Sequence, residues 1–134
     1  MKYKYGHWDS TIELIDGAIG FVYRITNNTN SRKYIGKKLL KFATSRKPLK
    51  GRVNKRRGTR DSDWESYTGS CNQLNEDITK TGKENFTFEI ICWCKSKSEL
   101  SYNEIKEIIL ANALYDNGYY NEYVGGRIRI RKSF

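Results

Sequence analysis

Residues 86–94 limit the fold most strongly, because apolar side chains recur there at every second position. The five residues are Phe86, Phe88, Ile90, Cys92 and Cys94. A period of two is that of a β-strand with one face in a hydrophobic core. The chain must therefore contain a sheet, and its other segments have to supply the partners of this strand.

Two further β-favouring segments lie earlier in the chain and are joined by a polar cluster. Residues 18–26 are rich in apolar residues, residues 27–31 are asparagine, threonine and serine, and residues 33–36 form a second short segment. Strand-like segments flanking a polar turn are typical of a β-hairpin. This hairpin supplies two partner strands.

Two helices are predicted from capping signals and apolar spacing. The first covers residues 70–82 and has a capping-box pair, an apolar pair four residues apart and a terminal glycine: Ser70 with Gln73, Leu74 with Ile78, and Gly82. The second opens with Ser96 and Glu99 at the same spacing and runs through Leu114 toward Gly118.

The order hairpin, helix, strand, helix predicts an α+β domain in which a three-stranded, mainly antiparallel sheet is flanked by helices. Short helical structure is expected just after Gly36. At 134 residues the chain has room for a single domain, residues 1–134. The basic C-terminal tail, residues 125–134, alternates arginine and isoleucine and predicts either an edge strand or a basic arm.

A basic stretch at residues 37–60 points to a polyanionic partner. The chain carries a net charge of +10, and this stretch holds eleven lysines and arginines with no acid. Pro48, Gly51 and Gly58 favour a loop for much of it, and a cationic loop can hold a phosphate backbone through counterion release. The candidate DNA-binding residues are Lys37, Lys38, Lys50, Arg52, Lys55, Arg56 and Arg57.

Other features bear on location and metal content. No apolar run approaches the roughly 20 residues of a spanning helix, and residues 1–8 lack the apolar core of a signal peptide, so we expect a cytoplasmic protein and no membrane partner.

Three closely spaced cysteines argue against a disulfide framework. Cys71, Cys92 and Cys94 could form a zinc site with His7, but the spacing favours two small buried strand residues instead.

Glu104 stands out within the second helix. Leu100, Glu104, Ile108 and Ala111 fall on one stripe of that helix, so an acid lies in an apolar, inward-facing row. A buried carboxylate needs a cation nearby, which is either a structural lysine or arginine or a divalent metal ion.

The hairpin carries a sequence that resembles the motif of the GIY-YIG nucleases. Gly20-Phe21-Val22-Tyr23 is followed, after ten intervening residues, by Tyr34-Ile35-Gly36. The second half matches the family letter for letter. The first half has Phe-Val-Tyr in place of Gly-Ile-Tyr but keeps the tyrosine.

The resemblance continues in order over residues 18–122. The family expects an arginine on the helix after the hairpin, a second helix, a third strand, a glutamate on the third helix and an asparagine beyond it. The corresponding positions are Arg46, Ser70 to Gly82, Phe86 to Trp93, Glu104 and Asn121. The segment from Ser70 also resembles phage homing nucleases, which implies action in a phage-infected bacterial host.

The resemblance implies a DNA endonuclease that uses one Mg²⁺ or Mn²⁺ ion. Tyr23 would deprotonate or orient the attacking water with support from Tyr34, Arg46 would bind the scissile phosphate, and Glu104 would hold the metal. Asn121 would steady Glu104 or the phosphate. Lys37, Lys38 and the metal are the candidates to lower the tyrosine pKa. The two lysines, with Arg52, are also the substitutes for Arg46.

Several alternatives stay open. The chain could be a basic nucleic-acid-binding module that has the fold without the chemistry, or a structural RNA-binding protein. Trp64, Tyr67, Gly69 and Ser70 read first as packing and capping residues, with stacking on a displaced base as the alternative. The partner is expected to be double-stranded DNA, bound by a monomer or a homodimer.

Overall fold

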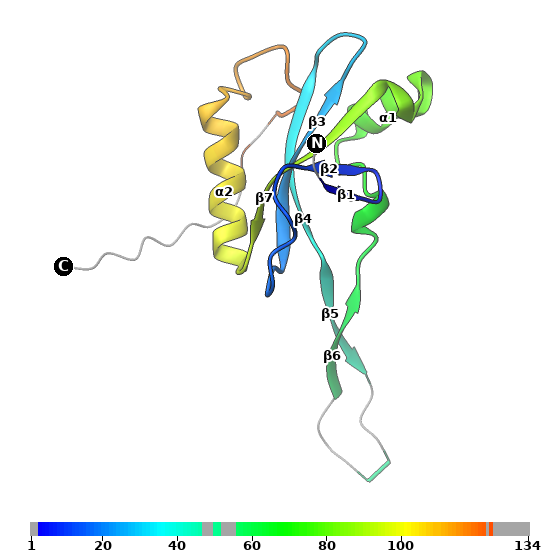
Figure 1. Cartoon of the computed structure of the whole chain (residues 1–134), viewed down its shortest axis with the longest axis vertical. Helices are drawn as coiled ribbons and strands as arrows, with labels where there is room; N and C mark the ends of the chain where they lie inside the picture. The colour runs from blue at the N-terminus through cyan, green and yellow to red at the C-terminus, as the bar shows by residue number, and fades with distance from the viewer. Residues whose placement is uncertain (1–2, 47–49, 52–55, 123, 125–134) are drawn as a thin grey trace, which may run out of the picture.

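In the computed structural model, residues 3–46, 50–51, 56–122 and 124 are described, and they form a five-stranded sheet, two α-helices and a separate two-stranded ribbon (Figure 1). The strands are β1 (Tyr3–Tyr5), β2 (Trp8–Ser10), β3 (Gly20–Asn27), β4 (Lys33–Leu39), β5 (Lys41–Arg46), β6 (Arg56–Asp61) and β7 (Phe86–Cys94). The helices are α1 (Asn72–Thr81) and α2 (Lys97–Leu110), with 3-10 turns η1 (Trp64–Ser66) and η2 (Lys83–Asn85). No helix in the described ranges is long and apolar enough to cross a membrane.

The sheet confirms the predicted hairpin and central strand but is larger than expected. Its order is β1-β2-β7-β3-β4, and β3 pairs antiparallel with both β4 and β7. The expectation of three strands was too few, because β1 and β2 add a short N-terminal hairpin and β2 pairs parallel with β7. The α+β class is confirmed, with a mixed sheet.

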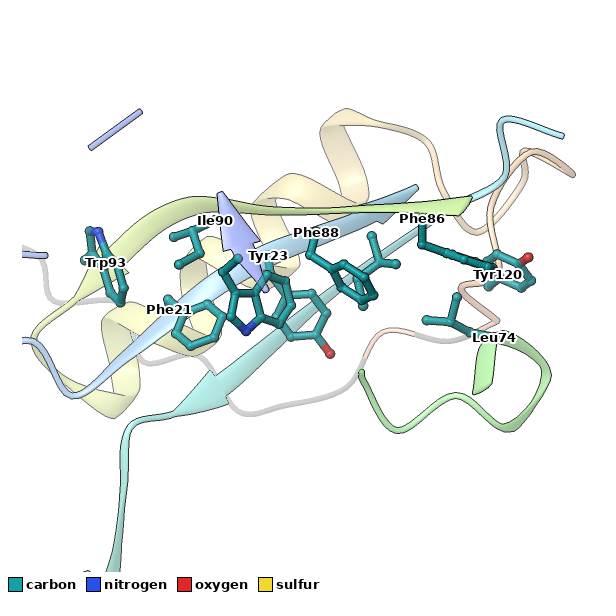
Figure 2. Close-up of a cluster of buried hydrophobic side chains, with 10 residues drawn as sticks. Phe21, Tyr23, Leu74, Phe86, Phe88, Ile90, Trp93 and Tyr120 are labelled. Atoms are coloured by element: carbon teal, nitrogen blue, oxygen red, sulfur yellow. The ribbon is translucent and has the colours of Figure 1, made fainter. Parts of the chain in front are cut away.

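The two helices cover opposite faces of the sheet (Figure 1). Leu74 of α1 packs with an aromatic cluster that includes Trp8, Tyr23 and Phe88, and Figure 2 shows the labelled members of this cluster on one side of β7. Leu100 and Ile108 of α2 pack on the other face with a smaller cluster. Every β3 side chain from Phe21 to Tyr23 is buried, since the strand has a helix on each side.

A β-bulge changes which face the residues of β7 occupy. Tyr23 pairs with Ile90 while the preceding Val22 pairs with Cys92, so one extra residue is inserted into β7. Before the bulge Ile90 lies in the aromatic cluster, and beyond it Cys94 packs with α2. The single-faced strand predicted over residues 86–94 is therefore wrong in its last third.

The helices begin and end near the predicted positions, with two differences. Cys71 is the N-cap of α1 and makes no side-chain capping bond, so the predicted cap by Ser70 is not formed. The Ser96 side chain does cap α2, accepting from the Glu99 amide at 3.1 Å. That helix ends at Leu110 and not near Leu114.

Most of the stretch predicted as a basic loop is β-structure. β4 runs to Leu39 with no helix after Gly36, and β5 and β6 pair over six residues each to form a projecting hairpin, here named the basic ribbon (Figure 1). Its root is fastened by Ser62, whose amide donates to the Leu40 carbonyl at 2.9 Å and whose hydroxyl donates to the Leu39 carbonyl at 2.6 Å. Arg52, Lys55 and the basic tail lie outside the described residues.

Candidate active site

A cavity of about 740 Å³ opens at the β4 edge of the sheet, between the start of α1, the middle of α2 and residues 120–122 and 124. Its volume is within the range of small-ligand sites. It brings together four of the five predicted catalytic residues together with one of their predicted cationic neighbours: Tyr23, Tyr34, Glu104 and Asn121, with Lys37.

Tyr23 reaches the cavity from the buried face of β3. Its side chain is 1% exposed, and its ring lies 6.2 Å from that of Tyr34, centroid to centroid. The ring crosses the backbone of Gly36, where an added Cβ would lie 2.6 Å from the Tyr23 Cζ atom. The glycine of the Tyr34-Ile35-Gly36 motif is therefore required for the tyrosine to occupy this place.

The surroundings of both tyrosines oppose ionisation. Burial raises the pKa of Tyr23 well above its ordinary value, and the neighbouring Tyr34, Tyr67 and Glu104 raise it further. Burial also raises the pKa of Tyr34, against a lowering by a hydrogen bond with Ser70. The expectation that Lys37 and Lys38 lower these pKa values was wrong, since neither lysine is among the groups that shift them. A lowering by the metal ion stays a prediction.

Glu104 lies on the inward stripe of α2, as predicted, and its carboxylate faces the cavity. Burial raises its pKa, and Lys37 partly offsets this. The Lys37 Nζ atom also donates a hydrogen bond to the Ser101 hydroxyl at 2.9 Å, so its ammonium group is not dedicated to Glu104 alone. A carboxylate that is half buried and only partly compensated fits a divalent cation, and Mg²⁺ is often held by one or two carboxylates with water and phosphate completing its shell.

Asn121 fixes the segment after α2 against β4. Its Oδ1 atom accepts from the Ile35 amide at 3.0 Å, and its Nδ2 atom donates to the Ile35 carbonyl at 2.8 Å. Two backbone hydrogen bonds join the same segments, since the Lys33 amide donates to the Gly118 carbonyl at 2.9 Å and the Tyr120 amide donates to the Lys33 carbonyl at 2.7 Å. Asn121 therefore holds the backbone between Tyr34 and Gly36, and both polar atoms of its side-chain amide bond to Ile35. Its expected role toward Glu104 or the phosphate stays a prediction.

The first turn of α1 forms the opposite wall of the cavity, which the sequence had not assigned to the site. Cys71, Asn72 and Gln73 line it. The first turn contains no acid and the N-cap provides no side-chain acceptor, so this helix start presents backbone N–H groups and the positive end of the helix dipole. Two exposed acids on the cavity rim, Glu76 and Glu122, were also missed, since neither lies on an apolar stripe.

Other predicted residues lie away from the cavity. Arg46 is in strand β5 of the basic ribbon and not on a helix, paired with Arg56. This strand belongs to the ribbon that projects beyond the sheet (Figure 1). Lys38 lies over the Tyr67 ring at 3.9 Å with its Nζ atom 3.0 Å from Asp63, and its side chain is only 11% exposed. Lys50 is exposed in the turn beyond β5.

The residues weighed for zinc are not gathered in one place. The Cys92 and Cys94 sulfurs are 4.0 Å apart, whereas the His7 ring stacks on Phe88 on the opposite face of the sheet. Among the described residues, no group of three histidine, cysteine or acidic side chains could hold a metal ion. Trp64 packs against the aromatic cluster, which confirms packing as its role.

The sheet, the two facing tyrosines and the glutamate of α2 define a domain of the GIY-YIG class. The chain belongs to the family described as "Putative endonuclease segE, GIY-YIG domain", which it matches over residues 4–124. A curated relative is "Putative endonuclease segE" of Enterobacteria phage T4, 32% identical over 106 residues. These residues cover 79% of this chain but 42% of the relative, so the chain spans less than half of that protein's length. No solved structure matches.

Proposed function

We propose that this chain is a DNA endonuclease that hydrolyses phosphodiester bonds with the help of one divalent metal ion. The observation that supports the proposal is the meeting of Tyr23, Tyr34, Lys37 and Glu104 in one cavity, from three separate elements. A purely structural domain would have no reason to bury a carboxylate beside two tyrosines at a pocket wall.

The scissile phosphate would bind between the start of α1 and Lys37. Backbone N–H groups at a helix N-terminus form a ready anion site, and Lys37 contributes a full positive charge from the facing strand. This arrangement would supply, within the cavity, the cationic role that the family resemblance implied for Arg46.

Glu104 would hold Mg²⁺ or Mn²⁺, which supplies charge neutralisation at the leaving oxygen. Glu104 would be ionised when it does so, and the metal's charge would offset the burial that raises its pKa.

The tyrosine hydroxyls would act by orienting water. Because the pKa values of Tyr23 and Tyr34 are raised, both stay neutral at pH 7, and a neutral hydroxyl can donate one hydrogen bond and accept others. Tyr34 is the less buried of the two and has Ser70 as a neighbour, so it is better placed to contact the attacking water, with Tyr23 behind it.

Incubation with supercoiled duplex plasmid, in Mg²⁺ or in EDTA, tests the proposal. Nicked or linear DNA is expected only with Mg²⁺, and Glu104→Ala should lose at least 100-fold in rate while Glu107→Ala, on the same helix outside the cavity lining, keeps it. Binding without cleavage by the unmodified chain would instead favour the non-catalytic binding module. The phage relative supports a role within an infected bacterial cell.

A further inference from the structure

The basic ribbon has two faces of different charge. The register pairs Phe42 with Arg60, Thr44 with Gly58 and Arg46 with Arg56, and these alternate pairs share one face because side chains alternate along a strand. This face, here named the arginine face, carries three arginines and no acid.

The opposite face is closer to neutral. It carries Lys41, Arg57 and Asp61, and Lys41 lies 4.0 Å from its cross-strand partner Asp61. The positive charge of the ribbon is thus concentrated on the arginine face.

The arginine positions of this face lie toward the two ends of the ribbon. Arg46 and Arg56 pair at the far end, Arg60 lies near the root, and the pair between them is Thr44 with Gly58. A polyanion lying along this face would meet positively charged residues at both ends of the ribbon.

We infer that the basic ribbon lies in the major groove of duplex DNA, with the arginine face toward the phosphates and base edges. The groove is about 12 Å wide and admits a two-stranded ribbon. Six paired residues span about 20 Å, and the ribbon projects beyond the sheet (Figure 1). Its far end would therefore contact DNA about six base pairs beyond the root of the ribbon, at 3.4 Å per base pair.

The ribbon is attached firmly enough to transmit this placement to the cavity. β4 carries the cavity residues Tyr34 and Lys37 and leads directly into β5. At the other strand, Ser62 is hydrogen-bonded to the end of β4, and the next residue, Asp63, pairs with Lys38. A duplex bound by the ribbon is thereby held in a fixed position relative to the cavity. The inference rests on the proposed function for the identity of the duplex as substrate.

Two double variants that remove the same charge from opposite faces test the inference. R46A/R56A should lower the slope of log K against log salt by about 1.8 on duplex DNA, at about 0.9 for each phosphate contact. K41A/R57A should leave the slope nearly unchanged. Binding is measured in EDTA, so the outcome does not depend on cleavage, and R46Q/R56Q repeats the test with longer side chains should the alanine variant fold poorly.

Chemical protection identifies the groove. The unmodified chain should protect guanine N7, in the major groove, from dimethyl sulfate and leave adenine N3, in the minor groove, reactive; R46A/R56A should lose that protection. Equal slopes for the two double variants, protection of adenine N3 alone, or tighter binding to duplex RNA would each overturn the inference. Cleavage in Mg²⁺ is measured separately. If the protein cleaves DNA but the two double variants show equal salt slopes, only the inference about the basic ribbon is refuted. If the slopes and the guanine protection are as expected but no cleavage occurs, only the proposed nuclease activity is refuted.

Discussion

Asn121 and Ile35 are joined by two hydrogen bonds in which a side-chain amide takes the place of a neighbouring strand. The Ile35 amide and carbonyl both point to Asn121, at 3.0 and 2.8 Å. The motif residues Tyr34 and Gly36 flank this contact, so the edge of β4 that faces the cavity is completed by a residue 86 positions away.

Asn121→Asp should loosen this edge, because a carboxylate can accept from the Ile35 amide but repels its carbonyl. Leaving one buried polar group unpaired costs about 1 to 3 kcal/mol. We expect a matching fall in the free energy of unfolding and faster hydrogen exchange of the Ile35 amide. Asn117→Asp, at an exposed neighbouring position, is the control, and equal effects of the two changes would contradict the assigned role.

Glu104→Gln should make the protein more stable at neutral pH. Burial raises the pKa of this acid, so the folded chain holds its proton to higher pH than the unfolded chain does, and stability falls as pH rises through that window. The glutamine variant lacks this loss, so its melting temperature should exceed that of the unmodified protein at pH 7 and converge with it below about pH 4. Mg²⁺ should raise the melting temperature of the unmodified protein only. A variant less stable at pH 7 would show that the carboxylate is well compensated.

His7 should make the fold sensitive to acid. Burial and the nearby Lys83 lower the pKa of this imidazole from 6.5 to about 4, and its ring stacks on Phe88 at 4.0 Å. The unfolded chain takes up the proton first, so stability should fall as pH drops from 6.5 toward about 4. His7→Gln should show a flatter melting temperature over this range, and parallel curves would rule out His7 as the source.

Gly36→Ala should destabilise the domain by about 1 to 3 kcal/mol, as overpacking in a close-packed core does. The new methyl group would meet the Tyr23 ring and lie 3.0 Å from Cε2 of Tyr34. Gly118→Ala, where the nearest atom is the flexible Asp116 carboxylate, is the control and should cost much less. Chemical denaturation measures both, and an unchanged midpoint for Gly36→Ala would mean that the Tyr23 ring has room to move.

The sequence was informative where structure follows from neighbouring residues. The hairpin of β3 and β4, the α1 helix with its end at Gly82, and the position of Glu104 on the inner stripe of α2 all come from local patterns. The tyrosine motif and Glu104 line one cavity because the β3–β4 hairpin and α2 pack on each other.

The features that were missed depend on contacts between distant segments. β1 and β2 have three residues each, too few to show a period, and they exist because Trp8 fills the aromatic cluster. The bulge in β7 reverses a pattern that looked uniform. The pairing that forms the basic ribbon could not be read from a stretch whose composition is that of a loop.

All three tryptophans of the chain belong to one side of the sheet. Trp8 and Trp93 lie within the aromatic cluster and Trp64 packs against it, 6.1 Å from Trp93 between ring centroids. Intrinsic fluorescence would therefore monitor only the region between the N-terminal hairpin and the root of the basic ribbon. Circular dichroism at far-ultraviolet wavelengths would report both helices, including α2 on the other side of the sheet. Coincidence of the two unfolding curves would show that both layers melt as one cooperative unit.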